Sequence, residues 1–179
     1  PPEVYTYDQW SFTIIGAGRV LGGECSITVE KLVSPLVIDF KGQGVKFTQD
    51  INATLFNYGR GYEPTYWIEN SEDVAFLAID RNGNRKIDDI NELFGDKTRK
   101  GDGKKTFLNG FDALAALDSN HNGEIDNHDE AFSRLKLWFD RNHDGKSDPG
   151  ELKRLSTMGV EAISLKYENV VEFQDAKGN

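Results

Sequence analysis

The chain has little cysteine, little methionine and no long apolar run. It contains 179 residues, of which one is Cys and one is Met. Because Cys25 has no partner in the chain, an internal disulfide scaffold is excluded. A single cysteine does not decide whether the protein is cytosolic or exported. No stretch approaches the ~20 apolar residues that a membrane-spanning helix needs. The chain opens with Pro1, Pro2 and Glu3 and shows no secretion signal, so we expect a fragment of a longer protein.

Positive charge is also scarce. The chain carries 21 Lys and Arg against 30 Asp and Glu, which gives a formal net charge of −9 at pH 7. Such a chain would repel nucleic-acid phosphates, so we expect no nucleic-acid partner. Hydrophobic residues make up 37% of the chain, enough for a proper core. The acidic residues concentrate between residues 69 and 151, and their loop-like spacing fits a cation-binding region better than a solvated acidic face.

The strongest motif is the segment 140–151, which reads D-R-N-H-D-G-K-S-D-P-G-E. It matches every position of the calcium-loop pattern D-x-[DN]-x-[DN]-G-x5-E. Calcium takes about six to eight oxygens, so alternate residues of a tightly wound loop must direct oxygens at one centre. Gly145 stands where the chain turns through a backbone shape that glycine adopts most easily. The expected ligands are Asp140, Asn142, Asp144, the carbonyl of Lys146, Asp148 and Glu151, the last with two oxygens.

The segment 118–129 has the same plan. Because its twelfth position is Asp129, one methylene shorter than Glu, we expect weaker binding here unless Glu130 helps. The two loops begin at residues 118 and 140, 22 apart, and we expect them to share one helix over residues 129–139. This spacing resembles the duplicated loop-helix repeats of dockerins. The expected ligands are Asp118, Asn120, Asn122, the carbonyl of Glu124, Asp126 and Asp129.

A third, imperfect loop covers residues 80–92. Its sixth position is Arg85 and its twelfth is Asn91, with Glu92 one residue late. A non-glycine residue in the left-handed conformation costs ~1 kcal/mol or more, so we expect weaker occupancy unless Gly83 takes the turn. The alternative is a polar turn that opens a helix over residues 88–94. The expected ligands are Asp80, Asn82, Asn84, the carbonyl of Lys86, Asp88 and Glu92.

The cofactor predicted by these segments is Ca²⁺, at two sites and at a third in residues 80–92. Zinc is the competing metal, but His121, His128 and His143 have no partners at zinc-ligand spacing. We assign no catalytic residue.

The apolar pattern predicts an α+β fold with short strands in the N-terminal half. Strands are expected at residues 32–40, 45–48, 54–58, 65–69 and 74–79. Helices are expected at residues 88–94, 107–117, 129–139 and 151–158. The helices would follow the loops as tandem EF-hand-like or dockerin-like units, and a closing strand is expected at residues 163–167.

The chain is expected to divide into three parts. Residues 1–33 contain two β-rich runs, 11–15 and 26–30, separated by Gly22 and Gly23, which predicts a β-hairpin that serves as a linker or flanking segment. Residues 34–173 would form the calcium-binding module, and residues 174–179 a loose tail.

Several strings between residue 34 and about residue 167 are typical of one bacterial family. They are S-P-L-V-I-D-F-K-G-Q-G-V, I-D-x-x-x-E-L-F-G-D, G-F-x-A-L-A-x-L-D and L-K-L-W-F-D-R-N-H-D-G-K-S-D-P-G-E-L. They resemble the self-processing module of iron-regulated RTX proteins. The resemblance implies an adhesin or toxin, secreted by or displayed on a Gram-negative bacterium. It also implies calcium-driven cleavage of an Asp-Pro bond at the start of the module, in which the aspartate carboxylate attacks its own carbonyl and a lysine or water captures the anhydride.

The chain departs from that family pattern at the scissile position. The pattern is D-P-L-x-L-D-L-D-G-D-G, whereas here Ser34 precedes Pro35, and Lys41 and Gln43 replace acidic residues. Serine has no carboxylate that could form the anhydride, so we expect no cleavage at this bond. The Asp148–Pro149 pair lies inside the best calcium loop, and we interpret it as structural.

Three functional hypotheses follow. The first is a calcium-binding folding module of a secreted or surface RTX-type protein. The second is a calcium-dependent self-cleaving, isopeptide-forming module that has lost activity at Ser34. The third is a dockerin-like module that binds a protein partner in a calcium-dependent way. The expected partners are calcium ions and either neighbouring domains of the same chain or another protein.

Overall fold

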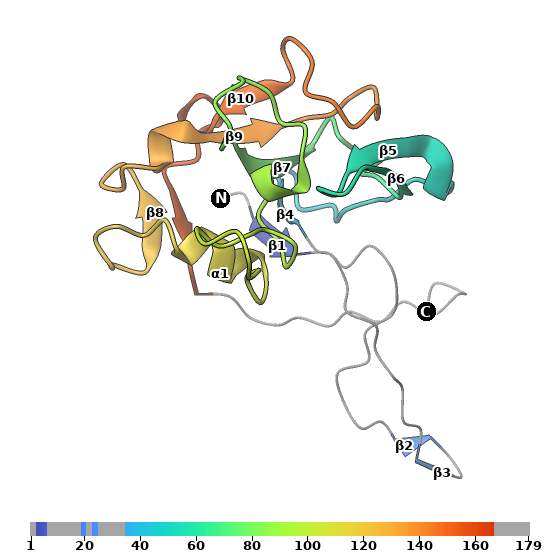
Figure 1. The fold of residues 1–179 in the computed structure, drawn as a ribbon, viewed down its shortest axis with the longest axis horizontal. Helices are drawn as coiled ribbons and strands as arrows, with labels where there is room; N and C mark the ends of the chain where they lie inside the picture. The colour runs from blue at the N-terminus through green and yellow to red at the C-terminus, as the bar shows by residue number, and fades with distance from the viewer. Residues whose placement is uncertain (1–2, 7–18, 21–22, 25–34, 167–179) are drawn as a thin grey trace.

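The computed structural model describes residues 3–6, 19–20, 23–24 and 35–166, and strands dominate them (Figure 1). The strands are β1 (Glu3–Thr6), β2 (Arg19–Val20), β3 (Gly23–Glu24), β4 (Leu36–Asp39), β5 (Thr54–Asn57), β6 (Tyr62–Thr65), β7 (Val74–Ile79), β8 (Glu124–Asp126), β9 (Leu135–Trp138), β10 (Leu152–Arg154) and β11 (Ala162–Ser164). The helical elements are α1 (Gly110–Ala115) and the 3-10 turns η1 (Ile51–Ala53), η2 (Ile90–Glu92), η3 (Phe132–Arg134) and η4 (Leu155–Met158). Among these, none is long and apolar enough to cross a bilayer.

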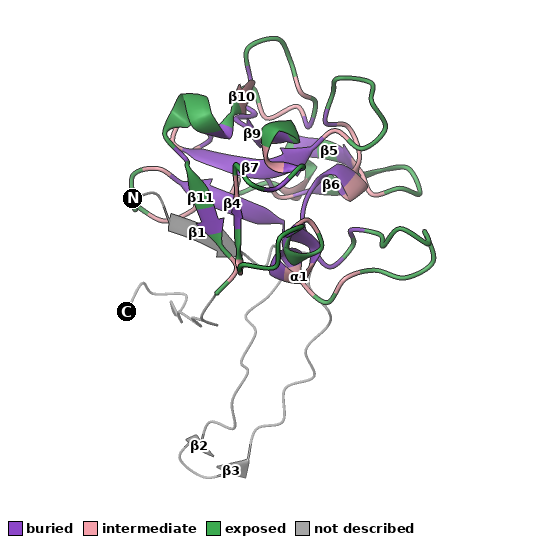
Figure 2. Ribbon diagram, turned by 90° about the vertical axis from the view of Figure 1, so that its left-hand side faces the viewer, coloured by how far each residue is buried: buried purple, intermediate pink, exposed green. Residues whose placement is uncertain are grey.

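A five-stranded antiparallel sheet in the order β1-β4-β7-β9-β10 forms the centre of the molecule. Its middle strand β7 reads V-A-F-L-A-I, and all six residues are buried. Successive side chains of a strand point to opposite faces, so Leu77 and Phe76 enter different layers. The continuous apolar run is therefore explained by a sheet that is covered on both faces (Figure 2).

The two faces of the sheet carry two different cores. One core is mainly aliphatic and joins Leu77 of the sheet to Leu114 of α1 and Ile163 of β11. The other is aromatic and collects Phe56, Trp67, Phe76 and Trp138, which are all buried. Smaller two-stranded sheets, β5-β6 and β8-β11, complete the module.

The fold is mostly β, which corrects the expected α+β class. The shared helix predicted over residues 129–139 is wrong, because this segment forms η3 and then β9. Phe132, Leu135 and Trp138 recur at helical spacing, but Leu135 and Leu137 also alternate with Lys136, which is the period of a strand. Pairing with β7 on one side and β10 on the other favours the strand.

The helices predicted after the other two loops also differ from the structure. Residues 151–158 form β10 and the 3-10 turn η4, which Gly159 ends with a φ of 75°, as expected for a stop signal. Residues 88–94 contain only η2. Only the segment 107–117 holds an α-helix, α1. The described residues therefore contain no EF-hand or dockerin unit, because each loop leads into a strand or a single 3-10 turn.

Several strand predictions are confirmed. The run 74–79 coincides with β7, the run 54–58 contains β5, and the run 32–40 contains β4. β11 (Ala162–Ser164) covers the first two residues of the closing strand expected at residues 163–167. Residues 45–48 contribute only a bridge between Phe47 and Ile68, and β6 ends where the run 65–69 begins. The predicted hairpin runs 11–15 and 26–30 lie outside the described residues.

Candidate metal centre

Four loops of the molecule begin with an aspartate that binds the loop backbone in the same way. We name residues 80–92 loop 1, residues 118–129 loop 2, residues 140–151 loop 3, and residues 39–44 the Asp39 loop. In each, the first aspartate accepts a hydrogen bond from the N–H group five residues later. The O–N distances are 2.7 Å for Asp39–Gly44, 2.8 Å for Asp80–Arg85, 3.0 Å for Asp118–Gly123 and 2.8 Å for Asp140–Gly145.

The four loops also share two left-handed backbone positions. The residues four and six places into each loop have positive φ: Gly42 and Gly44, Gly83 and Arg85, His121 and Gly123, and His143 and Gly145. The motif predicts the sixth position, whereas the fourth was predicted only in loop 1, where Gly83 was the alternative to Arg85. In loop 1 both Gly83 and Arg85 adopt the left-handed conformation, with φ of 78° and 67°, so Gly83 does not replace Arg85.

The last carboxylate of each longer loop bridges two backbone N–H groups of its own loop. Glu151 accepts from Arg141 N–H at 2.9 Å and from Asp148 N–H at 3.0 Å. Asp129 makes the equivalent pair with the N–H groups of Ser119 and Asp126. Glu92 does the same with Arg81 and Asp88, at 3.1 and 2.9 Å. Glu92 therefore joins the two ends of loop 1 although it comes one residue late, and its role as a calcium ligand stays a prediction.

The environments of these closing carboxylates differ. Burial raises the pKa of Glu92 above its usual range, although the N–H groups of Asp88 and Arg81 oppose the shift. The N–H group of Asp126 holds the pKa of Asp129 below its usual range, with help from Ser119. Asp129, although one methylene shorter than Glu, therefore closes loop 2 as an ionised carboxylate.

The side chains at the middle positions of the loops accept hydrogen bonds from N–H groups of the same loop. Asn82, Asn84, Asn120, Asn122, Asn142 and Asp144 each accept an N–H group two residues further on. The ninth-position carboxylates contact a side-chain nitrogen of their own loop, at 2.9 Å for Asp88–Asn84, 3.1 Å for Asp126–His128 and 3.1 Å for Asp148–Asn142. Among the expected ligands, direct side-chain contacts join Asn84 to Asp88 in loop 1 and Asn142 to Asp144 and Asp148 in loop 3. Over residues 35–166, however, no three His, Cys, Asp or Glu side chains form a group that could hold a metal ion.

Asp140 carries the clearest sign that a cation fits loop 3. Its side chain is 1% exposed, and Oδ1 has no hydrogen-bond partner. Burial raises the pKa of this carboxyl to about 6, and the charge of Glu151 adds to the shift, while hydrogen bonds from Gly145 and Trp67 oppose it. A buried carboxylate oxygen without a partner is costly, and a hard cation is the partner that it accepts best.

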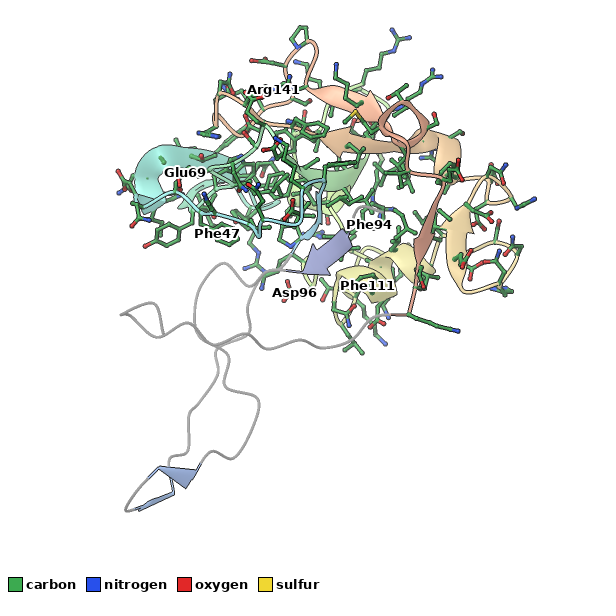
Figure 3. The ribbon with its side chains drawn as sticks, turned by 180° about the vertical axis from the view of Figure 1, so that it is seen from behind. Phe47, Glu69, Phe94, Asp96, Phe111 and Arg141 are labelled. Atoms are coloured by element: carbon green, nitrogen blue, oxygen red, sulfur yellow. The ribbon has the colours of Figure 1, made fainter. Side chains whose placement is uncertain are left out.

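The loops also contact one another and the rest of the module. The eighth residue of loop 1, Ile87, donates its N–H to the eighth residue of loop 3, Ser147 Oγ, at 2.7 Å. The eighth residue of loop 2, Ile125, instead pairs with Ile163 of β11. Arg141 of loop 3 contacts Glu72 at 3.4 Å, and Figure 3 shows Arg141 on the same side as Glu69, away from Phe111.

The Asp39 loop has the backbone of the other loops but a different charge. Lys41 occupies its third position, and the Lys41 ammonium contacts the Asp73 carboxylate at 2.9 Å. Asp39 itself is buried, and its two oxygens accept three backbone N–H groups, from Lys41, Gly42 and Gly44. This loop therefore closes around its aspartate with a lysine where the others have Asn.

The structure defines a β-sheet module in which three long loops begin with an aspartate and end with a carboxylate that bonds the loop backbone. Residues 36–179 match the family described as the SPM domain, the self-processing module, and the chain belongs to this family. The chain is 38% identical over 140 residues to "Iron-regulated protein FrpA" of Neisseria meningitidis serogroup C. That similarity covers 76% of this chain and 12% of FrpA, so the chain spans about one eighth of that relative. The family expected from the sequence is confirmed.

Proposed function

We propose that this chain is a calcium-binding folding module of a secreted or surface bacterial RTX-type protein. The observation that carries the proposal is the buried, unpartnered Oδ1 of Asp140 at the start of a loop that matches the calcium pattern at every position. The donor set of loop 3 consists of carboxylate, amide and backbone oxygens, which suit Ca²⁺ and not a soft metal. Loops 1 and 2 repeat the same backbone bonds and supply two further sites.

The mechanism is the linkage between binding and folding. A bound calcium ion would supply positive charge to the loop carboxylates, which in the present structure are held by N–H groups. An ion that binds only the folded chain stabilises it by RT ln(1 + [L]/Kd), ~4 kcal/mol at a thousandfold excess over Kd. Calcium is scarce in the cytosol and about millimolar outside cells, so the module would become most stable after export.

Calorimetry tests this proposal directly. We expect the unfolding temperature of the chain to rise by several degrees when calcium replaces a chelator, since ~4 kcal/mol is a large fraction of the stability of a small domain. Magnesium at the same concentration is the matched control, because it prefers rigid octahedral sites and keeps its own waters. Identical unfolding curves in chelator and in calcium would contradict the proposal.

Self-cleavage before Pro35 is the second candidate activity, because the chain belongs to the SPM family. The bond in question precedes Pro35, which is buried, and the next residue, Leu36, donates its N–H to Phe94 O at 2.7 Å. We propose that the chain does not cleave here, because the residue at position 34 is serine. Incubation with calcium should leave one band on a denaturing gel, whereas the Ser34→Asp variant should yield two fragments. Cleavage of the unaltered chain between residues 34 and 35 would overturn this view.

A further inference from the structure

Two buried indole rings reach the first and last carboxylates of loop 3. Trp67 Nε1 donates to Asp140 Oδ2 at 2.7 Å, across 73 residues of chain. Trp138 Nε1 donates to Glu151 Oε2 at 3.4 Å. Because the Trp67 and Gly145 N–H groups both bind Oδ2, the other oxygen of Asp140 is left for a cation.

Loops 1 and 2 have no equivalent support among the described residues. The recorded donors to Asp80 and Glu92 are backbone N–H groups of loop 1 itself. The donors to Asp118 and Asp129 are backbone groups of loop 2 and the Ser119 hydroxyl. Within the described part of the chain, loop 3 is thus the loop whose first and last carboxylates both accept hydrogen bonds from core side chains.

The two indoles hold each other in place. Their ring centroids are 5.6 Å apart in an edge-to-face arrangement, and Trp67 lies 4.8 Å from Phe76. Both indoles are no more than 1% exposed. Side chains packed in this way have few alternative rotamers, so their N–H groups are directed at the carboxylates before any ion arrives.

Loop 3 also contacts residues 54–71, the segment that contains Trp67. Thr54 Oγ1 donates to the His143 carbonyl at 2.7 Å, and His143 Nε2 lies 3.2 Å from Ser71 Oγ. The α-carbon of Gly145 faces the Leu55 carbonyl so closely that an added Cβ would lie 2.7 Å from that oxygen. Loop 3 therefore packs against residues 54–71.

We propose that Trp67 and Trp138 are positioning residues that make loop 3 the tightest calcium site of the chain, and that calcium in loop 3 thereby fixes residues 54–71 against the central sheet. This inference rests on the proposed calcium function. It adds a structural consequence to calcium binding: an ion in loop 3 would stabilise the β5-β6 hairpin, which is distant from loop 3 in sequence.

Trp67→Phe tests the inference, because it keeps the ring packing and removes the N–H donor. Titration calorimetry and native mass spectrometry at graded free calcium should show one of three sites weakened by about 10-fold or more, with the other two unchanged. Hydrogen exchange gives a second readout. Amides of β5 and β6 should become protected at low calcium in the unaltered chain, and only at correspondingly higher calcium in the variant.

Leu36→Val is the matched control, because Leu36 lies in the aliphatic core, away from both indoles, and outside loops 1 to 3. It should lower stability and leave all three calcium affinities unchanged. If Trp67→Phe does not fold, Trp138→Phe carries the same test with a smaller effect, since its bond is longer. Unchanged affinities in these Trp variants, or an equal loss at all sites, would overturn the inference. A wild-type chain that binds no calcium would instead overturn the proposed function.

Discussion

Loop 3 and the Asp39 loop have the same backbone but different chemistry. Both place a buried aspartate against the N–H group five residues later, and both have positive φ at their fourth and sixth positions. Loop 3 then continues with Asn142 and Asp144, whereas the Asp39 loop has Lys41 and Gln43. The first aspartate and the two left-handed positions therefore suffice for the loop shape. On the proposed function, the third and fifth residues decide whether the loop binds an ion.

The largest expected effect comes from Asp140→Asn. In calcium the variant should lose about 3–4 kcal/mol of unfolding free energy, because one ion no longer contributes to the folded state. In chelator near pH 7 it should lose little or gain stability, because a buried charge with one unpartnered oxygen has been removed. Thermal unfolding in calcium and in chelator measures the change in unfolding free energy under each condition. A variant that is equally destabilised with and without calcium would show that Asp140 is only structural.

Gly145→Ala and Gly44→Ala sharpen the comparison between the two loops. Both glycines have positive φ, 72° and 80°, so each substitution costs ~1 kcal/mol of backbone strain. At Gly145 the new methyl group would also lie 2.7 Å from Leu55 O, whereas at Gly44 nothing lies within 4 Å. Denaturant unfolding should therefore show about 2–3 kcal/mol lost at Gly145 and ~1 kcal/mol at Gly44. Equal losses at the two sites would contradict the close packing of loop 3 on β5.

The pH dependence of the calcium-free chain tests the environment of Asp140. The pKa of this carboxyl is about 6 in the folded chain, against ~3.9 when unfolded. Between these values the folded state binds more protons, so this group's contribution to stability falls as pH rises from about 4 to 6 and is flat above 6. The difference in stability between the wild type and Asp140→Asn, measured in chelator, should follow that curve. A difference that does not change between pH 4 and 7 would contradict the raised pKa.

The smallest effect is expected from Lys41→Ala. Lys41 and Asp73 are partly exposed, with side chains 58% and 32% accessible, and pairs of this kind contribute about 0–1 kcal/mol. The variant should lose no more than that and bind the same number of calcium ions. A change in calcium stoichiometry would show that the Asp39 loop takes part in binding.

The sequence predicted the loops better than the elements between them. The spacing of aspartates and glycines is local, so each of the three loop segments could be found from the sequence, whereas their binding of calcium stays a prediction. The strand 74–79 was also clear, because six consecutive apolar residues with β-branched ends fit a buried strand. The helix expected over residues 129–139 was wrong because its apolar residues fit both a helical and a strand period. The strand is selected by pairing with β7 and β10, which are distant in sequence or not recognisable as strands in advance.

The support of loop 3 could not be predicted for the same reason. Nothing in the sequence links Trp67 to Asp140, which are 73 positions apart, and aromatic residues are ordinarily assigned to the core. The left-handed conformation of His121 and His143 has no strong local signal either, since histidine adopts it only occasionally. Local chemistry is thus readable from the sequence, whereas the burial that tunes it depends on the fold.

Native mass spectrometry of the intact chain in excess calcium tests the central claim most directly. We expect three bound ions, one for each of the loops 80–92, 118–129 and 140–151, and two in Asp140→Asn. A chain that carries no calcium at millimolar free ion, or a count that Asp140→Asn leaves unchanged, would contradict it.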